Sequence, residues 1–337
     1  MKLAVVSLFL VLGAIAPAIH AGPEDDYLAG MRLEAKEVGE LEKNLASHPD
    51  DLSLHARLLG YYGRLRLTSS SANAPAVKHM LWIIRNHPEA DLGLEGLTPT
   101  GDPSAYGELK QAWLDQVSLH PRDARVAGHA GKYFLVFDRV LAEKLLKEAQ
   151  ELDPHDPDWS EELGRLYALD EGRDAAIRAL AQLERARADD TSETSRMYRL
   201  DALAMTAFEA GDVDKASGYA SDLLAAARKL PKDWDYGNAI HHGNIVLGRI
   251  ALKRGDVKLA EDYLLKAGGT PGSPQLDSFG PNMSLARDLL AAGDKEVVLQ
   301  YFRLCGKFWA DGGATLDAWA RQVKAGQMPE FGASLVY

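Results

Sequence analysis

The sequence predicts an all-α protein built from antiparallel helix pairs. The strongest indication is an internal echo, in which residues 211–216 (GDVDKA) return at 255–260 as GDVKLA. Each copy separates two amphipathic stretches with helical spacing, where the glycine can end one helix in a left-handed conformation and the aspartate can cap the next. A weaker copy begins at 293–294. No alternating run is long enough to predict a strand, so we expect helices throughout.

The helix pairs resemble tetratricopeptide repeats. A Leu-Gly pair at 247–248 opens one unit, and a second Leu-Gly pair at 163–164 stands in the same register. The step from Ala142 to Ala176 is 34 residues, the period of the family. The resemblance covers roughly residues 123–309. It implies a right-handed superhelical solenoid, here of about 14–15 helices.

In this interpretation the chain divides into four segments. They are residues 1–21, a signal peptide; 22–122, helical repeats that match the family loosely; 123–310, closer repeats with inserts at 229–240 and 268–282; and 311–337, a capping helix and tail. Within the last segment Leu316, Trp319 and Val323 have the spacing of one buried helix face.

The first residues predict export. Lys2 precedes the apolar run 3–15, and Ala21 offers a small residue at a cleavage position. The apolar run is too short for a membrane span, and polar sequence follows it at once. We therefore expect cleavage near Ala21 and a periplasmic or secreted mature protein without a transmembrane segment.

Charge and cysteine content narrow the choice of partner and of chemistry. The 337 residues carry a net charge of −11, which argues against nucleic acid as a partner because phosphate backbones need clustered cations. One cysteine, Cys305, cannot form an internal disulfide, and its position near the end of a helix suggests a packed, inert thiol.

When the units are placed in a common register, three arginines recur at the position that follows the Leu-Gly pair. These are Arg165, Arg249 and Arg287. The resemblance implies that stacked first helices would align them along a concave groove that binds peptides. Since arginine holds a carboxylate through two hydrogen bonds, such a row suits an acidic or carboxylate-bearing ligand. The alternative is that they are ordinary solvated helix residues. Three further residues would line the same groove, Met205, Asp201 and His242.

Polar and aromatic residues concentrate in two inserts that flank one repeat unit. The candidates there are Trp234, Tyr236, Asn238, Asn244, Gln275 and Asn282. If the inserts meet in space, these side chains could form a binding site on loops that a rigid scaffold holds. The alternative is that the asparagines only cap helices.

The sequence predicts neither a metal site nor a cofactor. His241 and His242 are adjacent, so on a helix they point about 100° apart and rarely share one ion. The chain has no G-x-S-x-G sequence, no phosphate-binding loop and no dinucleotide fingerprint. No catalytic residue is therefore predicted.

The pattern as a whole favours an exported scaffold, not an enzyme, that binds a protein or peptide in its groove. One alternative is a structural subunit of an envelope or secretion assembly, recognised through its outer face or its ends. A further alternative is an enzyme with its site at the 232–283 inserts, which only the polar cluster there suggests.

Overall fold

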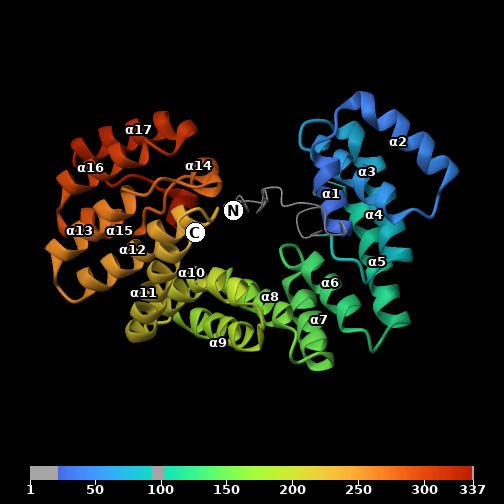
Figure 1. The fold of residues 1–337 in the computed structure, drawn as a ribbon, viewed down its shortest axis with the longest axis horizontal. Helices are drawn as coiled ribbons and strands as arrows, with labels where there is room; N and C mark the ends of the chain where they lie inside the picture. The colour runs from blue at the N-terminus through green and yellow to red at the C-terminus, as the bar shows by residue number, and fades with distance from the viewer. Residues whose placement is uncertain (1–21, 93–101, 336–337) are drawn as a thin grey trace. The chain divides into compact units, whose positions relative to one another are not determined.

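The computed structural model describes residues 22–92 and 102–335, so the predicted signal peptide lies outside the described residues. Within the described ranges the regular structure is helical (Figure 1). The first eight α-helices are α1 (Pro23–Met31), α2 (Ala35–Ser47), α3 (Leu52–Leu65), α4 (Asn73–Asn86), α5 (Pro103–Leu119), α6 (Ala124–Phe134), α7 (Arg139–Leu152) and α8 (Pro157–Ala168). The others are α9 (Arg173–Asp189), α10 (Glu193–Glu209), α11 (Val213–Lys229), α12 (Tyr236–Lys253), α13 (Val257–Gly268), α14 (Pro274–Phe279), α15 (Ser284–Ala292), α16 (Lys295–Cys305) and α17 (Gly313–Lys324).

Packing between residues divides the chain after Leu166 into an N-terminal unit and a C-terminal unit. This division falls within α8. The segment boundaries predicted from the sequence mark changes in repeat pattern and stay predictions. None of the described helices is both long enough and apolar enough to cross a bilayer.

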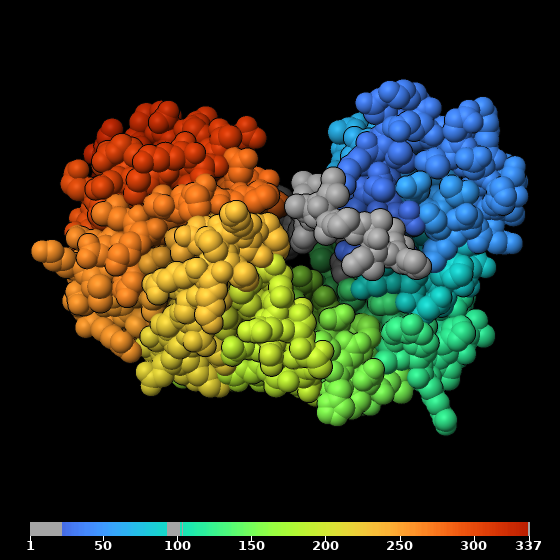
Figure 2. All heavy atoms as spheres, in the orientation of Figure 1, coloured from blue at the N-terminus to red at the C-terminus, as the bar shows by residue number. Residues whose placement is uncertain are grey.

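Each unit is a stack of helix pairs. In the C-terminal unit α10 packs on α11 and α12 on α13, and the first helices α10, α12 and α15 also contact one another in that order. The second helices α13 and α16 pack together in the same way. In Figure 2 the atoms of α11, α12 and α13, from yellow to orange, form one continuous packed surface. The predicted all-α solenoid of helix pairs is confirmed, although the described residues form 17 α-helices and not the predicted 14–15.

The glycine-aspartate turns form as the sequence indicates. Gly211 and Gly255 adopt φ values of 80° and 83° at the ends of their helices. Asp212 then accepts a hydrogen bond from the backbone N–H of Lys215, and Asp256 accepts one from that of Leu259. Each aspartate thereby caps the first turn of the following helix.

The final helix buries the apolar face that its sequence predicted. Leu316, Trp319 and Val323 of α17 are all buried, and they pack on Phe302 of α16 and on Phe331 beyond α17. Cys305 at the end of α16 is also fully buried, and this burial raises the pKa of its thiol. A neutral, enclosed thiol fits the predicted packing role.

Helices approach one another most closely where glycine removes the side chain. At the crossing of α1 and α3, a Cβ on Gly60 would lie 2.1 Å from the carbonyl oxygen of Tyr27. A Cβ on Gly30 would likewise lie 2.0 Å from the carbonyl oxygen of Arg57. In the C-terminal unit, a Cβ on Gly248 of the Leu-Gly pair would lie 2.2 Å from Leu285. At Gly30 and Gly60 the backbones can meet at these distances only while the positions stay glycine, whereas at Gly248 the absent side chain leaves room for the side chain of Leu285.

Replacing Gly60 by Ala is expected to lower the free energy of unfolding by about 1–3 kcal/mol, because the new methyl group meets backbone that cannot move aside. The matched control is Gly39→Ala in α2, where the added methyl group meets no neighbour. It is expected to raise the stability by about 0.5–1 kcal/mol through helix propensity. Urea unfolding followed by circular dichroism measures both, and equal effects would contradict close packing at Gly60.

Candidate functional site

Three successive first helices of the C-terminal unit share one charged face. We call it the first-helix face, and define it by Asp201 and Glu209 of α10, His242 and Arg249 of α12, and Arg287 and Asp288 of α15. Hydrogen bonds between these side chains join the three helices, so their membership of one face follows from contacts.

Arg249 is the central link of the first-helix face. Its Nη1 donates to Oε1 of Glu209 at 2.6 Å, and its Nε donates to Oδ2 of Asp288 at 3.0 Å. The guanidinium also lies 4.2 Å from the ring centroid of Phe208. The side chain is only 15% exposed. Arg249 therefore links α10, α12 and α15 through its hydrogen bonds.

Arg287 is more accessible. Its side chain is 42% exposed, and its Nε and Nη2 both donate to Oδ1 of Asp288, the next residue of its own helix. Asp288 is thus shared between Arg249 and Arg287. The predicted arginine position recurs, but in α12 and α15 each arginine has a carboxylate partner within the protein.

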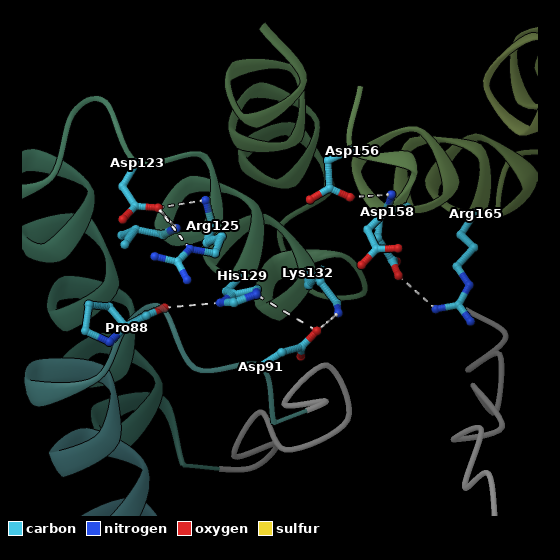
Figure 3. A network of polar contacts seen from close by, with 11 residues as sticks. Pro88, Asp91, Asp123, Arg125, His129, Lys132, Asp156, Asp158 and Arg165 are labelled. Atoms are coloured by element: carbon cyan, nitrogen blue, oxygen red, sulfur yellow. Dashed lines mark hydrogen bonds and ion pairs between the residues drawn. The ribbon is translucent and has the colours of Figure 1, made fainter. Parts of the chain in front are cut away.

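Arg165, the remaining arginine of the predicted row, lies in the N-terminal unit on α8. Its Nη1 donates to Oε1 of Glu162 at 3.0 Å, one turn earlier on the same helix (Figure 3). Figure 3 also shows Lys132 of α6 directed at Asp91, which follows α4. Nζ of Lys132 lies 2.8 Å from Oδ2 of Asp91. The first contact lies within α8, and the second joins α6 to the segment after α4.

A buried imidazole and a carboxylate join α10 to α12. Nδ1 of His242 donates to Oδ2 of Asp201 at 2.5 Å, and the imidazole is only 3% exposed. Burial alone would lower the pKa of His242, but the charge of Asp201 and its hydrogen bond outweigh burial and raise it. Among the described residues, no partner reaches Nε2 of His242 or Oδ1 of Asp201, although both atoms are buried.

A second carboxylate stands beside this pair. Asp235, directly before α12, has a pKa raised to about 7, first by burial and then by the negative charge of Asp201. Nδ2 of Asn238 donates to its Oδ1 at 2.8 Å. The cavity next to Asp235 has a volume of about 10 Å³, room for a single water molecule. This cavity is therefore too small for a substrate.

The two inserts meet at the start of α12. Asn238 donates to Oε1 of Gln275 at 2.7 Å and accepts from Oγ of Ser273 at 2.5 Å. The hydroxyl of Thr270 donates to the carbonyl oxygen of Gly237 at 2.8 Å. Asn238 is fully buried in this junction. The contacts lock the inserts to each other, which makes Asn238 and Gln275 positioning residues instead of exposed ligand contacts.

The other histidine and two of the candidate asparagines hold the scaffold together. Nδ1 of His241 donates to the carbonyl oxygen of Ala267, and its Nε2 accepts from the backbone N–H of Asn282. Burial lowers the pKa of His241 to about 3, so it is neutral. Oδ1 of Asn282 accepts from the backbone N–H of Ser284, the capping role left open by the sequence. Asn244 donates to the carbonyl oxygen of Ile240 on its own helix.

The accessible part of the insert is aromatic. Trp234 is 42% exposed, and its ring centroid lies 5.5 Å from that of Tyr198 on α10. The hydroxyl of Tyr198 donates to Oδ2 of Asp233 at 3.0 Å, which fixes this aromatic pair beside the first-helix face. The remaining candidates, Met205 and Tyr236, pack against apolar clusters of the unit.

The partners of the predicted residues could not be identified in the sequence. Glu209 and Asp288 meet Arg249 from about one repeat away on either side, and the pKa of Asp235 is raised first by burial and then by the charge of Asp201 on another helix. A search for carboxylates one repeat period from each arginine would have found the first two. Within residues 22–92 and 102–335, no three His, Cys, Asp or Glu side chains are placed to hold a metal ion.

The fold defines the chain as an all-helical repeat protein. No protein-family model matches the sequence, and no curated protein matches it. Among solved structures, the chain is similar to one titled "Crystal structure of APC/C hetero-tetramer Cut9-Hcn1". The identity is 13% and the TM-score 0.30, over 88% of this chain and 68% of that chain. A likeness of this degree carries no argument about function, which rests on the chain's own residues.

Replacing Asp201 by Asn is expected to lower the pKa of His242, because the charge and the hydrogen bond of Asp201 no longer oppose burial and only the charge of Asp235 still does. A raised pKa means that the folded state holds the proton more strongly. The stability that Asp201 provides is therefore present at acidic pH and is lost as pH rises through the pKa of His242. Histidine titration by NMR measures the shift. Asp233→Asn is the matched control, and an equal shift in that variant would refute the assignment.

Replacing Arg249 by Met is expected to cost about 1–2 kcal/mol of stability, because two carboxylates on different helices lose their shared partner. Arg287→Met is the control. It removes the same charge from a more exposed site and is expected to change stability by no more than about 0.5 kcal/mol. Thermal unfolding of both variants at one pH makes the comparison. Equal losses of stability in the two variants would contradict the role of Arg249 as a link between the helices.

Proposed function

We propose that the protein is an exported scaffold that binds a peptide or protein segment across the first-helix face and the adjacent aromatic insert. One observation carries the proposal. Three successive first helices present charged side chains on one face, and Trp234 with Tyr198 lies at its edge. Export rests on the signal-peptide pattern of residues 1–21.

Trp234 and Arg287 are the proposed anchors. Tryptophan and arginine are the residue types most enriched among energetically dominant interface positions. Trp234 is 42% exposed as a whole residue and Arg287 is 42% exposed in its side chain. Each contacts another side chain, Tyr198 in the first case and Asp288 in the second. A ligand therefore meets side chains that have already lost part of their rotational freedom, which lowers the entropic cost of binding.

The predicted acidic character of the ligand depends on Arg287. Arg249 is mostly buried and engaged by two carboxylates, so it has little capacity for a third. Arg287 has Asp288 as its partner. When a carboxylate of the ligand displaces Asp288 from Arg287, Asp288 stays paired with Arg249. An acidic group of the ligand can bind at this point without leaving a buried charge unpaired.

Assembly through the end of the array is less well supported. That alternative would use exposed apolar residues on the terminal helix near Trp319, but Trp319 is buried against Phe302 and Phe331. An enzyme site at the inserts also has little support, because the cavity beside Asp235 has room for only one water molecule.

The proposal is tested by affinity capture from an envelope extract with three baits besides the mature wild type. Trp234→Ala and Arg287→Glu alter the anchors, and Lys258→Glu makes an equal charge reversal on the second helix α13. A partner held by the wild type and by Lys258→Glu, but lost by both anchor variants, is the expected result. Arg249 is left unchanged, since its loss is expected to disturb the fold.

The captured partner is then purified and its affinity for each bait measured by calorimetry. We expect each anchor substitution to weaken binding by roughly tenfold or more, as for other dominant interface residues. Circular dichroism confirms that the variants keep their helices. Equal binding by all four baits would place the interaction elsewhere on the molecule and overturn the proposal.

A further inference from the structure

A groove with a volume of about 830 Å³ lies between α4 and α5 of the N-terminal unit. This volume falls within the usual range of ligand sites. The two helices pack side by side (Figure 1), and His55 of α3 also lines the groove. The site does not depend on the arginine positions or on the inserts, and it lies in the other unit of the chain from the first-helix face.

Trp82 forms a fixed platform in this groove. Its indole stacks on the imidazole of His55, with ring centroids 3.7 Å apart and planes inclined by 2°. Nδ1 of His55 lies 3.1 Å from Nδ1 of His79, and Nε2 of His55 lies 3.0 Å from the carbonyl oxygen of Pro49. Both histidines are buried. The indole is thus held by a neutral polar pair on one side while it also lines the groove.

Among the described residues, some charged side chains of the groove have partners within the protein and one has none. Lys78 and Arg85 stand about one turn before and after Trp82 on the same face of α4. Arg85 donates to Oε1 of Glu108 on α5 at 3.2 Å, and the carboxylate of Asp102 accepts from two backbone N–H groups at the start of α5. Lys78 is exposed and has no hydrogen bond or ion pair with the described residues. The groove therefore favours an anionic group beside Lys78.

The groove also offers hydrogen bonds suited to a peptide backbone. Asn73, at the first position of α4, lines it with an amide that has no hydrogen-bond partner among the described residues. An asparagine amide both donates and accepts, which matches the N–H and C=O groups of an extended chain. The groove therefore offers a ligand three kinds of contact, an aromatic surface at Trp82, a cation at Lys78 and an amide at Asn73.

We propose that this groove binds an extended peptide segment in which an apolar or aromatic side chain packs on Trp82 and a carboxylate pairs with Lys78. The spacing follows from helix and strand geometry. Lys78 and Trp82 are four residues apart on α4, a rise of about 6 Å. Side chains two residues apart in an extended segment lie on one side, about 6.6 Å apart. The ligand motif is thus an apolar residue and an acidic residue separated by one position.

The probes are short fluorescein-labelled peptides in a Gly-Ser background. One carries Phe-Ser-Glu, and a second carries Glu-Ser-Phe, because the direction of the segment is free. A third carries Phe-Ser-Lys, and a fourth separates Phe and Glu by three residues. Fluorescence anisotropy with the mature protein measures affinity, and the indole N–H signal of Trp82, assigned with Trp82→Phe, reports contact at the groove.

Binding of one of the first two peptides roughly tenfold more tightly than the third and fourth is the expected result. Lys78→Glu is expected to abolish this preference, and Trp82→Ala to weaken binding by at least about tenfold. The control, Arg122→Glu, reverses an exposed charge beyond the other end of α5 and is expected to leave affinity unchanged.

Three outcomes would overturn the inference: equal affinity for the Glu and Lys peptides, unchanged affinity in Lys78→Glu, or no shift of the Trp82 signal. Lys78 is exposed, so its substitution keeps the test valid even where Trp82→Ala fails to fold. Trp234→Ala and Arg287→Glu are expected to have no effect on these peptides. Binding at the groove and binding at the first-helix face can therefore be refuted independently of each other.

Discussion

The structure depends on the close approach of helix backbones at positions without side chains. Where α1 crosses α3, Gly30 and Gly60 each face a backbone carbonyl oxygen of the other helix, and no β-carbon fits at either position. In the C-terminal unit Gly248 instead leaves room for the side chain of Leu285. These contacts fix the separation between neighbouring helices, which in turn decides which side chains of successive repeats can reach one another.

At that separation, charges of neighbouring first helices satisfy one another. Arg249 reaches Glu209 on one side and Asp288 on the other, and His242 reaches Asp201. The face is thus already cross-linked before any ligand arrives. On such a face the exposed side chains can contact a ligand, while the buried side chains hold the helices in place. This arrangement is expected of a preorganised surface.

Each unit places a tryptophan on a polar support. Trp234 lies against Tyr198, whose hydroxyl is fixed by Asp233, and Trp82 lies on His55, which is fixed by His79 and by Pro49. In both cases the hydrogen bonds hold the aromatic partner in one orientation. The cations proposed to receive an acidic ligand group differ, Arg287 on the first-helix face and Lys78 in the groove beside Trp82.

The sequence by itself determined the helix pairs, the glycine-aspartate turns and the buried face of α17. All three depend on interactions within a few residues, such as the cap of Lys215 by Asp212 and the spacing of Leu316 and Trp319. Only the tertiary structure decided the partners of Arg249, the raised pKa of Asp235 and the stacking of Trp82 on His55. These features join residues of different helices, and the packing of one helix on the next sets which side chains meet.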